Sequence, residues 1–116
     1  MAGWLDLSAG APGAMLLGAL VDAGVPLDVL GTAVHALPVE RVTLTAEPDA
    51  RHGLGGTRVR VDAPESGVHR TWAEVRGILA GADLDRAVRE RAVAVFERLA
   101  AAEGRVHRVP ADEVHF

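Results

Sequence analysis

The chain has 116 residues, 49% of them hydrophobic and only 3% aromatic, and its 12 arginines and 16 acidic residues give a formal net charge of −4. It contains no cysteine and no lysine, which excludes disulfides, thiolate metal sites, catalytic cysteines, P-loop lysines and Schiff-base lysines. An acidic chain without lysine is also a poor candidate for binding nucleic acid or an anionic membrane surface.

Length and hydrophobicity together predict a single domain over residues 1–116 that can bury one core. The longest apolar stretch, Ala14 to Val21, is too short to span a bilayer. No basic region that would indicate a signal peptide opens the chain. We therefore expect a cytoplasmic protein without a membrane segment.

The first third of the chain is predicted to contain one strand and two helices. The apolar residues Trp4 to Leu7 indicate a short buried strand, and a glycine-rich turn follows it. Apolar residues then recur at helical spacing as far as Gly24, and Pro26 is well placed to open a second helix. The residues expected to line the inner faces are Met15, Leu16, Leu20 and Val21 in the first helix and Leu27, Leu30, Val34 and Leu37 in the second.

Hydrophobicity next alternates with a period of two. Residues 39–46 and residues 57–62 each show this alternation, which is typical of half-buried strands. The connection between them, residues 47–56, is rich in glycine and contains Pro48. We expect an antiparallel pair of strands joined by a mobile loop.

The last part of the chain is predicted to be helical. Thr71 to Glu74 matches a capping box, which opens a helix expected to end near Gly81. Asp83 is expected to cap a longer helix that runs to about Gly104.

The longer helix has a predicted apolar stripe and a predicted ion pair. Asp85 and Arg89 have the i, i+4 spacing of a favourable pair. The stripe consists of Leu84, Val88, Val95, Phe96 and Leu99. The predicted fold class is α/β (α+β), with a small sheet made of an N-terminal strand and an antiparallel pair, packed by about four helices.

The turn between the first strand and the first helix is a candidate anion site. Free amides and the helix dipole at such a turn attract phosphate, and glycine allows close approach. The candidate residues are Asp6, Ser8, Gly10 and Gly13, and Asp6 could accept a ribose hydroxyl or hold a metal. The spacing matches neither a Walker motif nor G-x-G-x-x-G, so on residue chemistry alone we favour a tight turn without a ligand.

The five histidines are the second candidate. Neutral imidazole suits nickel, copper or zinc, but a metal site needs several converging ligands. No two histidines have H-x-H or H-x₃-H spacing, so for any single one a surface or capping role is favoured. The histidines are His35, His52, His69, His107 and His115, and the last belongs with Glu113 and Asp112 to the richest cluster of potential ligands.

Three arginines form the third candidate. Arg58 and Arg60 lie on one face of the second predicted antiparallel strand and, with Arg70, could clamp a phosphate or a carboxylate. A solvated sheet face is the preferred interpretation of this group.

Three blocks of sequence resemble the LarC-type nickel-insertion proteins. Residues 5–22, LDLSAGAPGAMLLGALVD, are similar to the family pattern L-D-x-F-[AS]-G-I-[SA]-G-D-M-x-L-G-A-L-x-D. Residues 53–57, GLGGT, resemble its G-I-x-G-T strand entry. Residues 95–116 resemble its run I-F-x-x-L-A-x-A-E-x-x-V-H followed by E-V-H-F.

The resemblance implies a role in cofactor assembly. Members of this family insert nickel into a pyridinium bisthiocarboxylate mononucleotide, and so form the nickel-pincer cofactor of lactate racemase-like enzymes. They are CTP-dependent nickel chelatases of the lyase class. The resemblance implies a nucleotide phosphate at the turn that holds Asp6, Ser8, Gly10 and Gly13, and nickel at His69, His107 and His115.

The departures from the family pattern qualify this expectation. Ala14 stands where the family has an aspartate before methionine, and the match ends at Phe116, where the family continues. The resemblance thus implies an N-terminal part without the C-terminal CTP-binding domain, and CTP with a divalent cation is implied for the full-length family only. We expect this part alone to be inactive.

An alternative function is a non-catalytic nucleotide-binding or metal-binding module. It would assemble with a partner, either the missing C-terminal domain or a separate subunit. Formation of a homo-oligomer is a further option.

Overall fold

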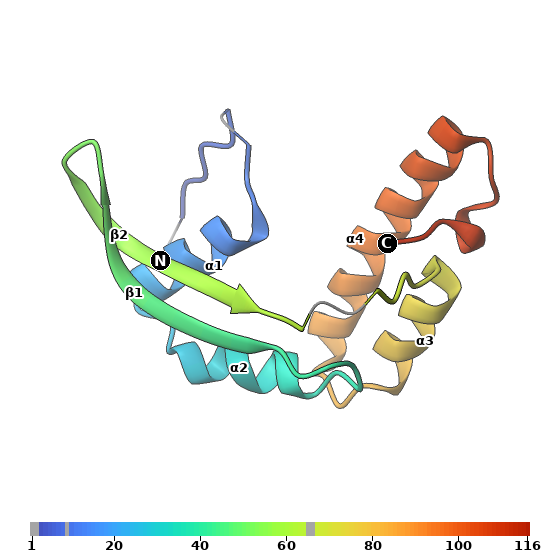
Figure 1. The fold of residues 1–116 in the computed structure, drawn as a ribbon, viewed down its shortest axis with the longest axis horizontal. Coiled ribbons are helices and arrows are strands. Elements are labelled where there is room, and N and C mark those ends of the chain that lie inside the picture. Colours follow the sequence, from blue (N-terminus) through green and yellow to red (C-terminus); the bar gives the residue numbers. More distant parts are fainter. Residues whose placement is uncertain (1–2, 9, 65–66) are drawn as a thin grey trace. The chain divides into compact units, whose positions relative to one another are not determined.

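A computed structural model describes residues 3–8, 10–64 and 67–116 (Figure 1). The chain divides into two compact units, one made of Met1–Thr32 and Val42–Ala63 and the other of Ala33–Arg41 and Pro64–Phe116. In the described ranges the fold has four α-helices and a two-stranded antiparallel sheet, which confirms the predicted mixed class. None of these helices is both long enough and hydrophobic enough to cross a membrane.

The first unit is built on a hairpin of β1 (Thr43–Arg51) and β2 (Leu54–Asp62). The pairing register separates its side chains into two faces, because successive residues of a strand point to opposite sides. One face is polar and carries Thr43, Thr45, Glu47, Asp49, Arg58, Arg60 and Asp62. The other is mainly apolar and carries Leu44, Ala46, Pro48, Thr57, Val59 and Val61. The alternation predicted from sequence is thereby confirmed.

The prediction of a mobile loop over residues 47–56 is wrong. Both strands continue through this region and meet at a two-residue turn, His52 and Gly53. These residues have φ values of 50° and 80°, and positive φ at both central positions is the signature of a type I′ turn. That turn matches the right-handed twist of the strands. Glycine and proline content alone does not distinguish a long loop from strand ends of this kind.

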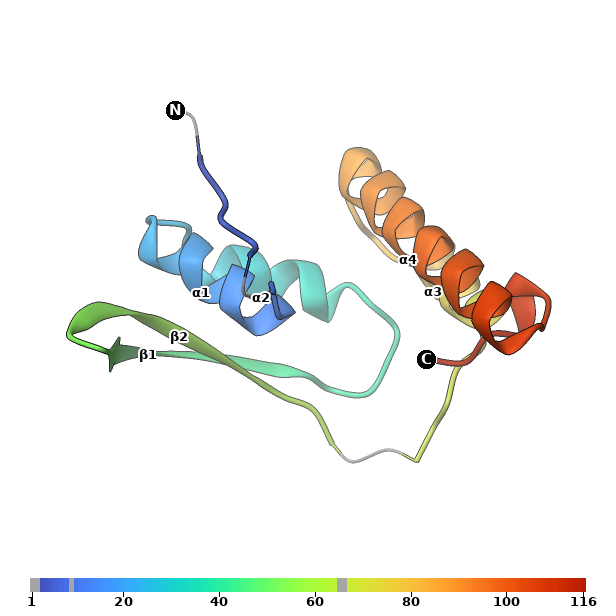
Figure 2. The ribbon, with the colours of Figure 1, turned by 90° about the horizontal axis from the view of Figure 1, so that it is seen from above.

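α1 (Gly13–Asp22) covers the apolar face of the hairpin (Figure 2). A Cβ atom on Gly18 would overlap the carbonyl oxygen of Thr57, so glycine lets the helix approach the strand backbone closely. The Thr57 hydroxyl donates to Oδ1 of Asp22 at 2.8 Å. Glycine at this position thus fixes how closely the helix packs on β2.

α2 (Leu27–His35) begins directly after Pro26, in agreement with the sequence. Asp28 lies in its first turn, near the positive end of the helix dipole. Beyond its C-terminus, Leu37 packs against the core of the second unit.

The prediction of a buried N-terminal strand over Trp4 to Leu7 is wrong. These residues have irregular structure, and the side chain of Trp4 is 92% exposed. A strand needs a hydrogen-bonded neighbour, and within the described residues the sheet contains only β1 and β2. Hydrophobicity alone cannot supply that neighbour.

The second unit contains α3 (Trp72–Gly81), α4 (Arg86–His107) and a short 3₁₀ helix, η1 (Ala111–Glu113). The predicted capping box is confirmed. The Glu74 amide donates to the Thr71 hydroxyl at 3.2 Å, and the Thr71 amide donates to Oε2 of Glu74 at 2.7 Å. Both groups would otherwise be unsatisfied at the start of α3.

Aromatic packing forms the core of the second unit. Trp72 and Phe96 stack with ring centroids 6.1 Å apart, and Phe116 meets Phe96 edge-on at 5.4 Å. The buried members of this core are Trp72, Leu79, Ala100 and Val114. The core therefore joins α3, α4 and the C-terminal segment.

The N-cap of α4 is Asp85, so the prediction of Asp83 is wrong. Oδ1 of Asp85 accepts from the amide of Ala87 at 2.8 Å. Arg89 does not pair with Asp85. Its guanidinium donates to three backbone carbonyls at the end of α3 and in the connection, those of Leu79 at 3.1 Å, Ala82 at 2.8 Å and Leu84 at 3.1 Å.

The predicted apolar stripe of α4 is only partly buried. Leu84 and Phe96 pack against the core, as predicted. Val88, Val95 and Leu99, the other predicted members of the stripe, are 48%, 66% and 43% exposed and do not join the core. α3 has 10 residues and α4 has 22, and the shorter helix covers only part of the longer one.

Candidate functional site

An open pocket of about 530 Å³ lies in the second unit, at the C-terminal end of α4. It brings together two histidines and two glutamates from separate parts of the chain. The lining residues are Thr71, Glu103, His107, Val109, Glu113, Val114 and His115. The two predicted metal ligands His107 and His115 therefore share one pocket.

The last turn of α4 supplies one side of this pocket. Glu103 and His107 are four residues apart, so they lie one above the other on the same face of the helix. Nε2 of His107 lies 3.2 Å from Oε2 of Glu103. Both side chains remain accessible, with exposed fractions of 66% for His107 and 43% for Glu103.

A sharp reversal of the chain brings His115 to the same pocket. The C-cap residue Arg108 adopts the left-handed conformation with φ of 57°, and the Val109 amide donates to the carbonyl oxygen of Gly104 at 3.1 Å. A Cβ atom on Gly104 would lie 2.9 Å from the carbonyl oxygen of Val109, so the reversal requires glycine there. His115 then forms an isolated antiparallel bridge with Thr71.

Backbone hydrogen bonds fix the C-terminal segment beside the start of α3. The Trp72 amide donates to the carbonyl oxygen of Val114 at 2.8 Å, and Arg70 and Phe116 exchange two backbone bonds at 3.3 and 2.9 Å. The position of His115 therefore depends on a buried core and a short ladder.

The capping box next to the pocket lowers the pKa of one carboxyl group, that of Glu74. The amide and hydroxyl of Thr71 hold the pKa of Glu74 below its ordinary value, and His115 contributes in the same direction. Arg70 donates to both carboxylate oxygens of Glu40 at 2.7 and 2.8 Å, which lowers the pKa of Glu40.

The pocket residues have suitable chemistry for a divalent transition metal. Imidazole nitrogens and carboxylate oxygens are ligands that nickel accepts. In residues 3–8, 10–64 and 67–116 no three histidine, aspartate or glutamate side chains converge closely enough to hold a metal ion as they stand. Binding would therefore require side-chain rotation, for which the exposure of His107 and Glu103 leaves room.

The remaining histidines lie outside this pocket. His69 precedes Arg70 on the segment that pairs with Phe116, but it is not among the lining residues. His35 is in the last turn of α2, and His52 is in the hairpin turn.

The predicted anion site lies in the exposed segment before α1. Oδ1 of Asp6 accepts from the Ser8 amide at 3.0 Å, and the Ser8 amide and hydroxyl lower the pKa of Asp6. Gly10 has φ of 89°, and its amide donates to the Leu7 carbonyl at 2.9 Å. Gly13 opens α1, which has no side-chain cap. Ala9, in the middle of this turn, lies outside the described residues.

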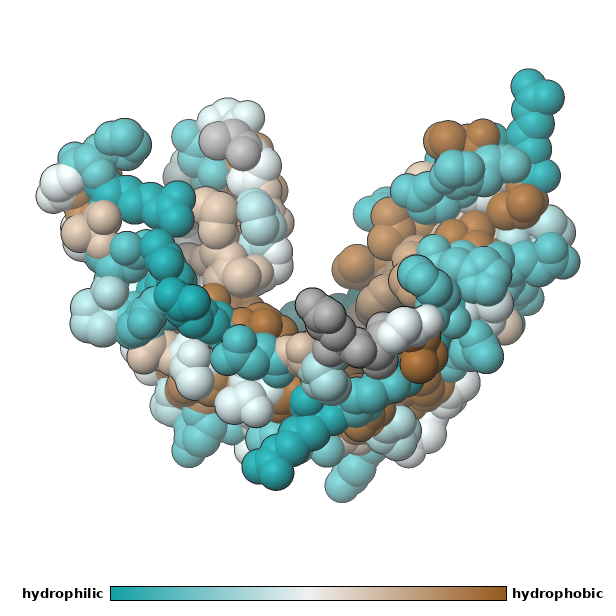
Figure 3. Space-filling view, viewed as in Figure 1, coloured by the Kyte–Doolittle hydropathy of each residue, from teal (hydrophilic) through white to brown (hydrophobic). Residues whose placement is uncertain are grey.

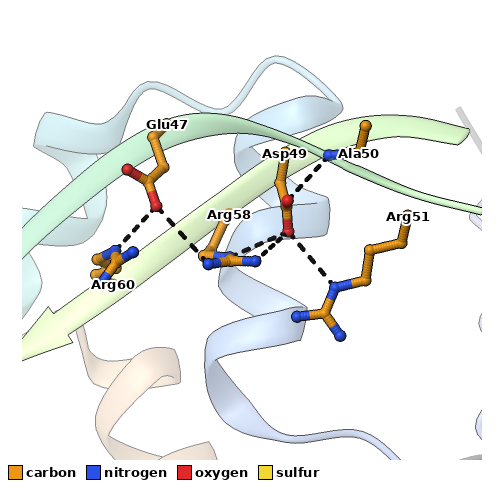
Figure 4. A network of polar contacts seen from close by, with 6 residues as sticks. All are labelled: Glu47, Asp49, Ala50, Arg51, Arg58 and Arg60. Atoms are coloured by element: carbon orange, nitrogen blue, oxygen red, sulfur yellow. Dashed lines mark hydrogen bonds and ion pairs between the residues drawn. The ribbon is translucent and has the colours of Figure 1, made fainter.

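The arginine group of the hairpin is paired with acids (Figure 4). Arg58 donates to Oδ2 of Asp49 at 2.6 and 3.0 Å, which lowers the pKa of Asp49, and Arg60 donates to Oε1 of Glu47 at 2.9 Å. Arg51 Nε also lies 3.6 Å from Asp49. These contacts support the preferred interpretation of a solvated, charge-balanced sheet face.

Sequence reasoning missed two polar residues of the pocket, Glu103 and Thr71, as members of the site. The i, i+4 spacing of Glu103 and His107 was an available signal, because such pairs share a helix face. The contribution of Thr71 had no local signal, since it is 44 positions before His115 and meets it only through the fold. Asp112, expected in the ligand cluster, instead accepts from Arg76 at 2.9 and 3.2 Å.

Comparison with known proteins gives consistent matches. The model of a family described as "Nickel insertion protein" matches residues 3–116. A Nocardioides protein named pyridinium-3,5-bisthiocarboxylic acid mononucleotide nickel insertion protein is 55% identical over 113 residues, which are 97% of this chain and 29% of that protein. A protein of the same name from Desulfitobacterium hafniense is 34% identical over 115 residues, covering 99% of this chain and 29% of that protein.

The chain thus spans less than a third of the length of these curated relatives. No solved structure shows a significant match to it.

Proposed function

The chain belongs to the nickel insertion protein family, and on that premise we propose that it is the nickel-binding N-terminal part of a protein that inserts nickel into pyridinium-3,5-bisthiocarboxylic acid mononucleotide. The names of these relatives support this substrate. Because the match covers 29% of those relatives, the complete insertion reaction is proposed for the longer protein.

The observation that carries the proposal is the pocket shared by His107 and His115. Nickel is the substrate of the reaction, and these imidazoles, with Glu103 and Glu113, would bind it before transfer. An open pocket with accessible ligands suits an ion that must be released again. His69 is a further proposed ligand, since it lies next to the backbone ladder that holds His115.

The mononucleotide is proposed to bind at the turn before α1. Support comes from the exposure of Asp6, Ser8, Gly10 and Gly13, and from the absence of a side-chain cap on α1. Uncapped helix amides favour a phosphate. Asp6 would accept a ribose hydroxyl and would give up its own bond to the Ser8 amide as the ligand enters.

Further components are proposed for the longer protein. CTP and a divalent cation would act in the region beyond the match, as the family resemblance implies. The expected partners are that region or a separate subunit, or a second copy in a homo-oligomer, and the expected location is the cytoplasm.

Nickel titration calorimetry tests the proposed metal site. His107→Ala and His115→Ala should each weaken nickel binding by about tenfold or more, because each removes one imidazole ligand. His35→Ala, a histidine in α2 far along the chain from the pocket, is the matched control and should bind nickel normally. Equal affinity in all four proteins would contradict the proposal, as would a parent chain that takes up no nickel.

A separate titration with the pyridinium mononucleotide tests the second site. Asp6→Ala should weaken binding, while Asp28→Ala, an exposed acid in the first turn of α2, should not. If both variants bind like the parent chain, the turn before α1 is not the nucleotide site.

A further inference from the structure

One side of α4 carries an apolar seam that is largely exposed. Its residues are separated alternately by four and three positions, which keeps them on one narrow face of a helix. The residues of this α4 seam are Val88, Ala92, Val95, Leu99, Ala102 and Val106. Val95 is 66% and Val106 74% exposed, and Figure 3 shows hydrophobic side chains at the surface of the unit that contains α4.

The spacing of the α4 seam is that of a helix–helix interface. Alternation of four and three residues over the length from Val88 to Val106 is the heptad pattern, in which both sets of positions insert into a facing helix. The buried side of α4 uses mainly other residues, including Phe96 and Ala100, to contact α3 and the C-terminal segment, and Ala92 of the seam is also partly buried against this core. The helix therefore has one apolar side that packs within its unit and a second apolar side that remains largely exposed and has the spacing of a helix–helix interface.

A row of arginines borders the α4 seam. Arg91, Arg98 and Arg105 are spaced seven residues apart, each directly precedes a seam residue, and all three are exposed. In the described part of the chain none of them forms an ion pair with a carboxylate. Arg86, by contrast, pairs with Glu90 at 2.7 Å.

Sequence spacing explains why these arginines have no partner in their own helix. Intrahelical ion pairs need an acid three or four residues away. At those distances Arg91 and Arg98 have only alanine and valine, and Arg105 has alanine, valine and another arginine. Their charge is thus available to a group outside α4.

We propose that the α4 seam binds an amphipathic helix of a protein partner, and that acidic residues flank the apolar positions of that helix. The apolar seam supplies contact area, and the arginine row selects the charge of the partner. In heptad interfaces the flanking charges set partner choice and orientation in this way.

The arginine row argues against a second copy of this chain as the occupant. In an antiparallel pair, the row of one copy would face the same row of the other, and like charges repel. In a parallel pair, Arg91 would face Phe96, which packs inside its own unit, and only Arg98 would face an acid, Glu103, which already lies 3.2 Å from His107. A partner helix with acidic flanks would place carboxylates opposite the arginine row and would avoid both of these arrangements.

Binding of designed peptides to the full 116-residue chain tests the proposal. The probe is a fluorescent helical peptide of about three heptads, with leucine at the a and d positions and glutamate at e and g. One control peptide carries lysine at e and g, and a second contains the glutamate peptide's residues in scrambled order. We expect the glutamate peptide to bind about tenfold or more tightly than either control at low ionic strength.

Charge reversal provides a matched test in the protein. Combined Arg91→Glu, Arg98→Glu and Arg105→Glu substitutions should reverse the preference, so that the lysine peptide binds better. Arg98→Glu alone should weaken binding of the glutamate peptide, while Arg41→Glu, at an exposed arginine outside α4, should change it little. Val95→Gln should weaken binding of the glutamate peptide to the parent chain and of the lysine peptide to the charge-reversed chain. The helical circular dichroism signal should stay unchanged.

Three outcomes would overturn the proposal. The first is equal binding of the ordered and scrambled acidic peptides, which would indicate charge attraction without a helix interface. The second is a lack of binding by any peptide. The third is a concentration-dependent dimer of the parent chain that Val95→Gln abolishes in sedimentation, which would assign the α4 seam to a second copy.

Discussion

Thr71 and Glu74 satisfy each other's backbone groups at the start of α3, and this pair makes stability depend on pH. The Thr71 amide and hydroxyl bond the ionised carboxylate and keep the pKa of Glu74 below its ordinary value. A lowered pKa in the folded state contributes stability that is fully present above the ordinary pKa. That contribution is lost as pH falls through the lowered value.

Glu74→Gln should therefore make the stability of the chain less sensitive to acid. Glutamine can still accept the bond from the Thr71 amide, so stability at neutral pH should fall only slightly. Urea denaturation at a series of pH values below neutrality measures the effect. Glu97→Gln, an exposed glutamate in α4, should retain the pH dependence of the parent chain, and an identical response of both variants would contradict this reasoning.

The hairpin turn shows how an element depends on one or two backbone conformations. His52 holds φ of 50° without being glycine, a conformation that asparagine adopts at lower cost. We expect His52→Asn to stabilise the chain by roughly 0.5 kcal/mol. Gly53→Ala should destabilise it by about 1 kcal/mol, because φ at Gly53 is 80°. Urea midpoints that move in the opposite directions would show that the turn has another geometry.

The junction between α3 and α4 depends on Arg89. Its guanidinium satisfies carbonyl oxygens of Leu79, Ala82 and Leu84, which lie at the end of α3 and just beyond it. Arg89→Met keeps much of the side chain but removes these donors, and should cost about 2 kcal/mol. Arg91→Met, at an exposed arginine of the same helix, should cost less than about 0.5 kcal/mol. Equal thermal midpoints for the two variants would argue against this role of Arg89.

At the scale of the whole molecule, glycines in helices have opposite roles depending on what packs against them. Gly18 faces the Thr57 carbonyl with no room for a Cβ atom, whereas nothing lies within 4 Å of the Cβ position of Gly31 in α2. We expect Gly18→Ala to destabilise the first unit by about 1–3 kcal/mol. Gly31→Ala should stabilise the chain by roughly 0.5–1 kcal/mol, because alanine favours helix.

Thermal unfolding followed by circular dichroism measures both glycine variants. Stabilisation by both substitutions would show that α1 does not pack on β2 through Gly18. Destabilisation by both would indicate that Gly31 also has a neighbour.

The candidate metal pocket also depends on how distant parts of the chain come together. The chain belongs to the nickel insertion protein family, and the blocks that carry the resemblance lie in different elements. The first block ends in α1, the second enters β2, and the third runs from α4 to the C-terminus. Only the third block contributes to the pocket with His107 and His115.

The sequence by itself determined the features that neighbouring residues encode. The capping box of α3, the start of α2 after Pro26 and the alternating faces of the hairpin were all correctly predicted. Each depends on hydrogen bonds or side-chain periodicity within a few positions, so the local sequence contains the necessary information. The resemblance to the family could likewise be detected from the sequence, because each of its motifs is a continuous stretch of residues.

Only the tertiary structure decided the features that depend on distant partners. Trp4 has the hydrophobicity of a strand residue, but among the residues that the structure describes no strand lies beside it, and Val88, Val95, Leu99 and Val106 of α4 remain exposed. Thr71 and His115 meet because Gly104 permits a chain reversal and the aromatic core holds the C-terminal segment. Burial and ligand convergence are properties of contacts between elements, and local sequence does not specify which elements meet.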